Sequence, residues 1–280
     1  NVTVNSGSKL DNQADITVSD TLTNKGTINN TGSVSTKDLV NNNGATINND
    51  GTLDATGDVS NNGTIANNNQ LNLANGTNSG TISGNGTTNI TGDVENTGTI
   101  SQKSVEVSNG GSLTTRADKL TTTDGVTNDG DLNLTGGTNN NNITGGGNTT
   151  FSGTSTNEGT ITQAVVNVAD GSKLTNNADI NADVTNGTGS TLDNNAKIEG
   201  ALTNNGTVDN SDGTIKGAVT NNAGASLTTV ADNIEGNIAN DGTLNLNGGT
   251  NNNVITGTGT TYVTADLTNN ADIRSEERRV

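Results

Sequence analysis

A six-residue repeat runs through this chain, in which an aliphatic residue is followed two positions later by Asn and four positions later by Gly. Leu22, Asn24 and Gly26 make up one such unit. The same unit starts again at Ile28, Val59, Val94, Leu202 and Ile238. Self-similarity at a short fixed period is typical of repeat architectures, in which each unit buries its apolar residue against neighbouring units. The function of such a chain has to be sought along an extended surface.

The even period predicts strands. In extended chain, residues six apart face the same side, whereas a helix of 3.6 residues per turn would scatter them. Ile, Val and Thr suit a pleated surface, and Gly and Asn tolerate the positive φ expected at corners. We therefore predict an all-β parallel β-solenoid of about 14 or 15 turns, with about 18 to 20 residues per turn and about 4.8 Å between turns. The residues expected to face inward include Leu22, Ile28, Ile47, Leu53, Val59, Ile65 and Leu71.

The repeated Asn has two interpretations. Only 26% of the chain is hydrophobic, with one Phe and one Tyr, so apolar burial alone does not offset the entropy of ordering the backbone. Stacked Asn side chains that hydrogen-bond from turn to turn would supply the remainder. Alternatively, the Asn residues lie outward at left-handed corners. The sequence leaves both open.

Composition excludes several classes of function. The net charge is −17 and the body of the chain has no cluster of Lys or Arg, which argues against binding to nucleic acid or to anionic lipid. Without an apolar run of about 18 residues, we expect no membrane insertion by this segment. The absence of Pro and the regular spacing of Ile, Leu and Val oppose disorder, although Gly and net charge alone would favour it.

A longer repeat overlies the short one. Leu-Asn-Leu begins at Leu71, Leu132 and Leu244, and an Ile follows each start 11 residues later. The heptapeptide 174–180 recurs unchanged as 267–273. Because no change of composition interrupts the pattern, we expect a single elongated solenoid domain over residues 1–273, as a fragment of a longer protein.

These units carry a resemblance. Asn62-Gly63-Thr64-Ile65 and the Leu-Asn-Leu-x-x-Gly-Thr segments resemble the passenger regions of Gram-negative autotransporter adhesins and filamentous-haemagglutinin-like proteins. The resemblance covers nearly the whole chain and rests on composition and period. It implies a parallel β-helix, usually right-handed, that a C-terminal translocator or a partner transporter outside this chain carries to the outer surface. The short repeats also resemble left-handed hexapeptide helices, so right-handed is favoured and the hand stays open.

Residues that carry chemistry are sparse. The chain has no His and no Cys, which removes the commonest nucleophile–base pairs and zinc sites. The acid pairs Asp129 with Asp131 and Asp209 with Asp212 lack accompanying aromatic or basic residues, and we interpret them as solvated turn acids. The glycine runs 84–86, 145–147 and 257–259 do not match calcium or phosphate loops and indicate corners. We predict no catalytic, cofactor-binding or metal-binding residue and no cofactor.

Two classes of function remain for a chain that is expected not to be an enzyme. The first is a structural or adhesive stalk, extracellular or on the bacterial surface, that mediates attachment to host or bacterial surface molecules, self-association or display. The second is a repetitive ice- or carbohydrate-binding face, because Thr recurs beside the aliphatic residue at Thr27, Thr46, Thr64, Thr99 and Thr243. A polysaccharide lyase or hydrolase is a third alternative.

The last seven residues break the pattern. Residues 274–280 contain three of the four Arg residues and two of the seven Glu residues, and they have no Asn, Gly or Thr. Arg-Ser-Glu-Glu-Arg-Arg-Val is also one reading frame of a common sequencing adapter. We therefore expect this segment to be a non-native translation, with a natural basic cap as the alternative.

Overall fold

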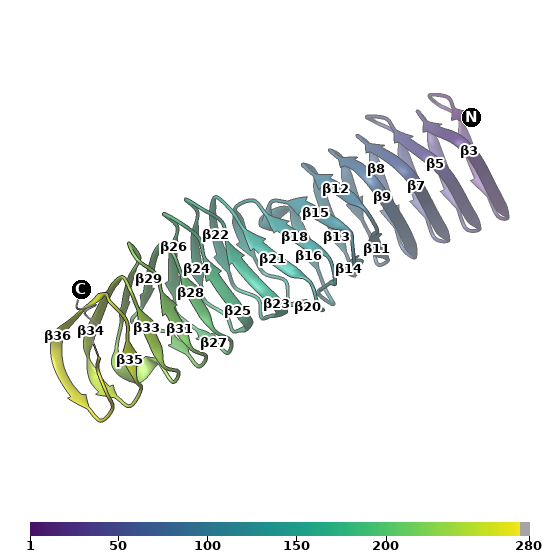
Figure 1. Cartoon of the computed structure of the whole chain (residues 1–280). Helices are drawn as coiled ribbons and strands as arrows, with labels where there is room; N and C mark the ends of the chain where they lie inside the picture. The colour runs from purple at the N-terminus through teal and green to yellow at the C-terminus, as the bar shows by residue number, and fades with distance from the viewer. Residues whose placement is uncertain (275–280) are drawn as a thin grey trace. The chain divides into compact units, whose positions relative to one another are not determined.

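The computed structural model describes residues 1–274, and the predicted fold is confirmed: these residues form parallel strands stacked into a β-solenoid, with no α-helix among them (Figure 1). The chain divides into two compact units. Unit 1 comprises Asn1–Leu134 and Asn140–Gly147, and unit 2 comprises Thr135–Asn139 and Asn148–Val280, of which the residues up to 274 are described. Together the units contain about 15 turns, where a turn is one circuit of the coil.

Unit 1 winds each turn through three strand segments. One face is a seven-stranded sheet of β2 (Lys9–Asn12), β4 (Thr27–Asn30), β6 (Thr46–Asn49), β8 (Thr64–Asn67), β10 (Thr81–Ser83), β13 (Thr99–Gln102) and β16 (Leu120–Thr122). The other two faces are formed by β1 (Val2–Val4), β3 (Asp15–Asn24), β5 (Ser33–Asn41), β7 (Thr52–Asn61), β9 (Gln70–Asn78), β11 (Thr87–Ile90), β12 (Asp93–Asn96), β14 (Ser104–Val107), β15 (Ser112–Thr115), β17 (Val126–Asn128), β18 (Asp131–Leu134) and β20 (Ile143–Thr144). A 3-10 turn, η1 (Ala117–Lys119), precedes β16.

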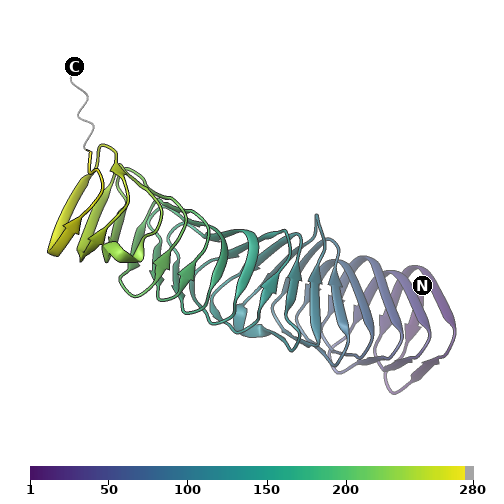
Figure 2. The same cartoon turned by 90° about the horizontal axis from the view of Figure 1, so that it is seen from below.

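Unit 2 is built in the same way (Figure 2). Its eight-stranded sheet consists of β19 (Gly137–Asn139), β22 (Thr154–Asn157), β24 (Lys173–Asn176), β26 (Thr191–Asn194), β29 (Thr207–Asn210), β32 (Ser226–Thr229), β34 (Thr243–Asn251) and β36 (Thr260–Asn269). The remaining elements are β21 (Asn148–Phe151), β23 (Ile161–Val168), β25 (Ile180–Asn186), β27 (Lys197–Ile198), β28 (Leu202–Asn204), β30 (Thr214–Ile215), β31 (Val219–Asn221), β33 (Ile238–Asn240), β35 (Ile255–Thr256) and the 3-10 turn η2 (Ala231–Asn233).

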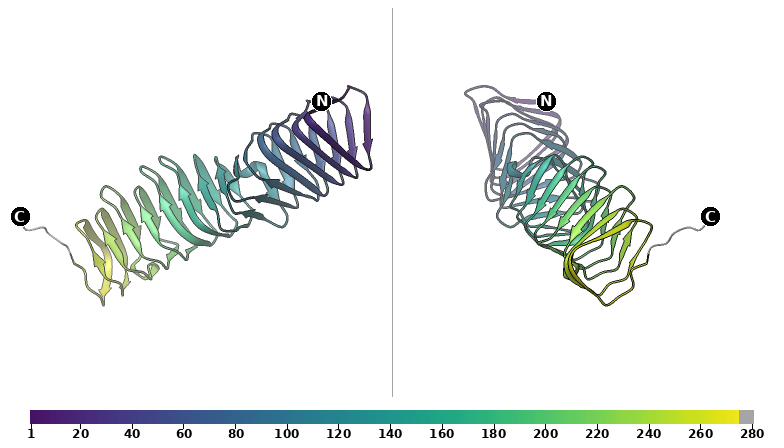
Figure 3. Two further views of the ribbon diagram at one scale, coloured as in Figure 1. Left: turned by 45° about the vertical axis from the view of Figure 1, so that its right-hand side comes forward. Right: turned by 90° about the vertical axis from the view of Figure 1, so that its left-hand side faces the viewer.

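The register fixes the length of each turn. Val2 pairs with Leu22, Leu22 with Leu39, and Leu39 with Val59, so successive turns take 20, 17 and 20 residues. The long strands β3, β5, β7 and β9 shift register in their middle and thereby pass from one face to the next. The views in Figure 3 show the strands of each unit stacked turn upon turn.

Aliphatic side chains fill the inside of the coil, as predicted. Leu22, Ile28, Ile47, Leu53, Val59, Ile65 and Leu71 are all buried. Along the strands, buried and partly exposed residues alternate, as in β4 and β6. Because a strand points alternate side chains to opposite sides, this alternation places Ile28 of β4 and Ile47 of β6 on the core side.

The repeated Asn residues also point inward. In unit 1, buried amides donate to the Asn of the next turn: Asn24 Nδ2 lies 2.9 Å from Asn41 Oδ1, and Asn41 Nδ2 lies 2.8 Å from Asn61 Oδ1. This amide ladder continues through Asn78 and Asn96. A second ladder in unit 1 joins Asn12, Asn30, Asn49 and Asn67. Unit 2 has two such ladders, Asn139–Asn157–Asn176–Asn194–Asn210 and Asn186–Asn204–Asn221–Asn240.

The alternative of outward, left-handed Asn corners is wrong, because no described residue other than Gly has positive φ. Some ladder Asn residues instead close their own corners: Asn24 Oδ1 accepts the Gly26 N–H at 3.1 Å, and Asn204 Oδ1 accepts the Gly206 N–H at 3.0 Å. The repeat glycines also differ from expectation, because Gly63 and Gly80 have no positive φ. A Cβ at residue 80 would lie 2.0 Å from the Gly63 carbonyl oxygen. Close approach of successive turns therefore requires Gly at these corners.

Candidate functional site

The threonines beside the aliphatic residues form a column on the seven-stranded sheet of unit 1. Thr27 pairs with Thr46, and the register continues through Thr64, Thr81 and Thr99. All five are half-buried, and they alternate with the buried Ile residues of the same strands. Sequence reasoning missed Thr81, although it stands directly before Ile82 as the others stand before their aliphatic residues. Thr243 does not belong to this column, because it lies on the eight-stranded sheet of unit 2 and pairs with Ser226.

Of the two acid pairs singled out from the sequence, Asp129 and Asp212 lie in bends between strands, whereas Asp131 and Asp209 lie in strands β18 and β29. Asp129 Oδ1 accepts the backbone N–H of Gly146 at 2.8 Å. Asp209 Oδ1 accepts the N–H of Ser211 at 3.0 Å and its hydroxyl at 2.6 Å. Both carboxylates thus accept N–H groups of their own unit. All four acids are exposed, but Asp131 and Asp209 are strand residues and not the turn acids expected from the sequence. Among the described residues, no three acidic side chains gather in a group that would hold a metal ion.

Several Asp carboxylates accept a backbone N–H from the following turn. This recurring contact was not predicted from the sequence. Asp170 accepts from Thr188, Asp183 from Ala201, and Asp232 from Thr250. Asp241 Oδ1 accepts both the N–H and the hydroxyl of Thr258, each at 2.8 Å. These two hydrogen bonds, first the one from the backbone, lower the pKa of Asp241 below its ordinary value. In these four pairs the acceptor lies 17 or 18 residues before its donor, which is the length of a turn.

The three glycine runs are equivalent corners. Gly84, Gly145 and Gly257 all have positive φ, between 110° and 125°. The backbone N–H of each middle residue donates to a side-chain oxygen of the preceding turn: Asn85 donates to Asn68, Gly146 to Asp129, and Thr258 to Asp241. The runs are therefore corners, in agreement with the sequence analysis.

The corner at Gly84 interrupts an amide ladder. Gly84 stands in the turn between Asn67 and Gln102 and has no side chain to continue the ladder. Asn67 Nδ2 instead donates to Gln102 Oε1 at 2.7 Å, across 35 residues. The longer Gln side chain thus spans one turn.

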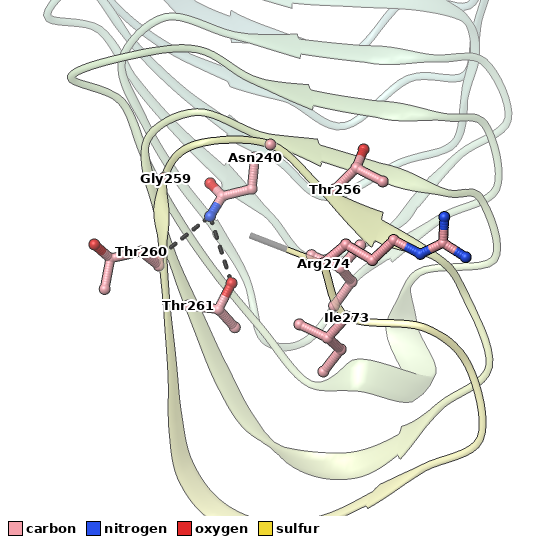
Figure 4. A pocket seen from close by; sticks show the side chains of 9 residues that line it. Asn240, Thr256, Gly259, Thr260, Thr261, Ile273 and Arg274 are labelled. Carbon is pink, nitrogen blue, oxygen red and sulfur yellow. Dashed lines mark hydrogen bonds between the residues drawn. The ribbon is translucent and has the colours of Figure 1, made fainter. Parts of the chain in front are cut away.

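The corresponding corner at Gly257 lines an open cavity of about 360 Å³ in unit 2. Its lining residues are Asn240, Ile255, Thr256, Gly257, Gly259, Thr260, Thr261, Ile273 and Arg274. Figure 4 shows the Asn240 amide directed toward Thr260 and Thr261 at its edge. The cavity combines apolar side chains with buried amide hydrogen-bonding groups.

The expected non-native segment begins at Arg274, and the rest of it lies outside the described residues. Arg274 donates its backbone N–H to the Ile255 oxygen at 2.8 Å, and its side chain pairs with Asp272. Within residues 1–274, no helix is long and apolar enough to cross a membrane.

Comparison with known proteins gives no assignment. No family model matches the chain, and neither the search of curated proteins nor that of solved structures found a match.

Proposed function

We propose that this chain is a structural or adhesive stalk, exported to the bacterial surface or beyond it, that serves attachment, self-association or display. The observation that supports this most is the pair of buried amide ladders in each unit. The ladder amides bond from one turn to the next, and some, such as Asn24, also close their own corner, so the turns stack in fixed register. At about 4.8 Å per step, the seven-stranded sheet of unit 1 extends about 30 Å along the stack.

Such a stack provides length with few aromatic or aliphatic residues. Each turn needs only a few buried aliphatic side chains, because amide hydrogen bonds and strand pairing supply the other contacts between turns. The resemblance to autotransporter passengers and filamentous-haemagglutinin-like adhesins supports the same function. The partners are then host or bacterial surface molecules or a second copy of the chain, and a translocator or partner transporter provides export.

Coated beads test this proposal. Beads that carry the chain by one end should adhere to cells or clump with one another, whereas beads that carry an unrelated acidic protein should do neither. A single molecule pulled from its two ends should resist force turn by turn. Absence of adhesion and clumping, together with extension at negligible force, would refute the stalk.

The threonine column supports a second candidate, a repetitive binding face for ice or carbohydrate. Five hydroxyl-bearing side chains in register present the same group at every step of the sheet. Replacing Thr64 and Thr81 together by Lys should abolish ice shaping or polysaccharide retention if this face binds. Thr77→Lys, on another face of unit 1, is the matched control. Equal activity of both variants, or no activity of the unaltered chain, would exclude this candidate.

A further inference from the structure

Eight asparagines in this chain are followed directly by glycine: Asn43, Asn62, Asn75, Asn85, Asn109, Asn186, Asn205 and Asn247. Asparagine loses its side-chain amide most readily before glycine, because glycine has no side chain to hinder attack by its backbone nitrogen on the preceding carboxamide. The attack requires a glycine N–H that no acceptor holds and an asparagine side chain that is able to turn toward it. The structure separates the eight steps by these two conditions.

Two of the eight steps lie at the tips of equivalent β-turns, residues 42–45 and 108–111. In each, the N–H of the fourth residue donates to the carbonyl oxygen of the first, at 2.9 and 2.8 Å respectively. The third residue of each β-turn is a glycine with positive φ, 78° for Gly44 and 81° for Gly110, as a type II turn requires. The asparagine is the second residue of each.

Both tips leave the reacting groups free. Within residues 1–274, neither Gly44 nor Gly110 has an acceptor for its N–H. Among the same residues, the side chains of Asn43 and Asn109 have no hydrogen-bond partner, and both asparagines are exposed. An added Cβ on either glycine would meet nothing within 4 Å. The backbone nitrogen and the carboxamide therefore approach each other without breaking a contact of the fold.

At the other six steps the fold holds one of the two groups. Four of the glycines donate their N–H to an oxygen of another residue, Gly63 to Asn41, Gly86 to Asn67, Gly187 to Val168 and Gly206 to Asn204, at 2.9 to 3.1 Å. Asn75 and Asn247 lie in strands β9 and β34 and accept a hydrogen bond through Oδ1. Release of such a hydrogen bond has to precede the attack, so these steps react more slowly.

We propose that Asn43 and Asn109 are modification sites, at which the folded protein converts asparagine to aspartate and isoaspartate with water as the co-reactant. The glycine nitrogen bonds to the asparagine Cγ as its proton passes to the solvent, and the carboxamide nitrogen takes up a proton and leaves as ammonia. Water then opens the cyclic imide at one of its two carbonyl carbons. The net reaction exchanges the amide –NH2 for –OH, and the carboxyl group formed adds one negative charge to unit 1 at each site.

Unit 2 contains the aspartyl product at an equivalent position. Residues 169–172 form the same β-turn, with a 3.1 Å hydrogen bond between its ends and φ of 67° at Gly171. Its second residue is Asp170, whose carboxylate accepts the N–H of Thr188 at 2.7 Å. An aspartate is therefore compatible with this β-turn. Isoaspartate adds one carbon to the backbone at a tip that forms no strand pairing, so conversion leaves the stacked strands in register.

Peptide mapping by mass spectrometry tests this on the full folded chain. After incubation in mildly alkaline buffer made with heavy-oxygen water, the peptides containing Asn43 and Asn109 should carry an acid with one heavy oxygen atom. They should convert about tenfold faster than the peptides containing Asn62, Asn85 and Asn205, which is the factor expected when a hydrogen bond has to be released first.

The unfolded chain in guanidinium is the matched control, because every Asn-Gly step is free there and these peptides should convert at similar rates. Asn43→Gln, which closes its ring less readily, should stop conversion at that tip and leave conversion of Asn109 unchanged. Equal rates for the two tips and for Asn62, Asn85 and Asn205 in the folded chain would overturn the proposal. It is also overturned if the tips keep their amides in the folded chain while the unfolded chain loses them.

Discussion

Asn61 and Asn78 are bonded side chain to side chain across consecutive turns, with 2.6 Å between Asn61 Nδ2 and Asn78 Oδ1, and neither is exposed by more than 1%. Asn61 also accepts from Asn41 at 2.8 Å, so it is one member of an unbroken chain of amides. Each amide uses its oxygen toward the preceding turn and its nitrogen toward the next. The ladder therefore has a direction that follows the chain.

Replacing Asn61 by Ala should destabilise unit 1 by about 2 to 6 kcal/mol, because the Asn41 donor and the Asn78 acceptor lose partners in a buried place, at about 1 to 3 kcal/mol each. Urea unfolding followed by circular dichroism measures this change. Asn62→Ala is the control: Asn62 is exposed and its side chain donates to Ser60 Oγ at 3.2 Å, so removal of this side chain should change stability by no more than about 0.5 kcal/mol. Similar effects of the two variants would contradict a structural role for the ladder.

A charge in the aliphatic core should open the coil locally. Ile65 is fully buried, and Ile65→Asp places an unpaired carboxylate among Ile47 and Ile82, its neighbours in the adjacent turns. Because each turn contacts only its neighbours, limited proteolysis should cut near residue 65 and spare turns further away. Thr64→Asp, on the outward side of the same strand, should remain uncut. Loss of the whole of unit 1 would instead show cooperativity beyond nearest neighbours.

The corner at Asp241 should respond to acid. Hydrogen bonds from Thr258 lower the pKa of Asp241 below 3.8, so its contribution to stability is present above that value and is lost as pH falls through the lowered pKa. Hydrogen exchange of the Thr258 amide, corrected for intrinsic rates, should therefore lose protection only below about pH 3.8. Asp241→Asn keeps an acceptor oxygen without that titration and should show no such loss. An equal acid response of both proteins would rule out this carboxylate as the cause.

The sequence predicted the inward aliphatic residues because an even period has one structural solution in extended chain, and Leu22 to Leu71 are buried accordingly. The sequence did not decide whether the Asn side chains point inward or outward, because an amide suits both a ladder and a left-handed corner. What decides between them is the register, which places Asn24 beside Asn41 although they are 17 residues apart. The handedness of the coil stays a prediction.

The corner acceptors and the glutamine that spans a turn were not predictable from local pattern. Asp241 and Thr258 are partners only because this turn takes 17 residues, and turn length varies along the chain. Gln102 gains its role from the missing side chain of Gly84 in the preceding turn. An alignment of the two long modules that start at Leu71 and Leu132 would have shown glutamine at matching positions, Gln102 and Gln163, which was the available signal.

The repeat glycines should be intolerant of even a methyl group, for a reason different from backbone conformation. Gly80 has no positive φ, but a Cβ there would lie 2.0 Å from the Gly63 carbonyl oxygen, a separation that forces two turns apart. Gly44 offers the matched control, since it has φ of 78° with nothing within 4 Å of the added Cβ. Gly44→Ala should cost about 1 kcal/mol of conformational strain. Gly80→Ala should lower the free energy of unfolding by more than Gly44→Ala does. It should also speed exchange of the amides paired between β8 and β10, which the Gly44 variant leaves protected. A larger loss of stability for Gly44→Ala than for Gly80→Ala in urea unfolding would show that φ, and not the spacing of turns, selects glycine at these corners.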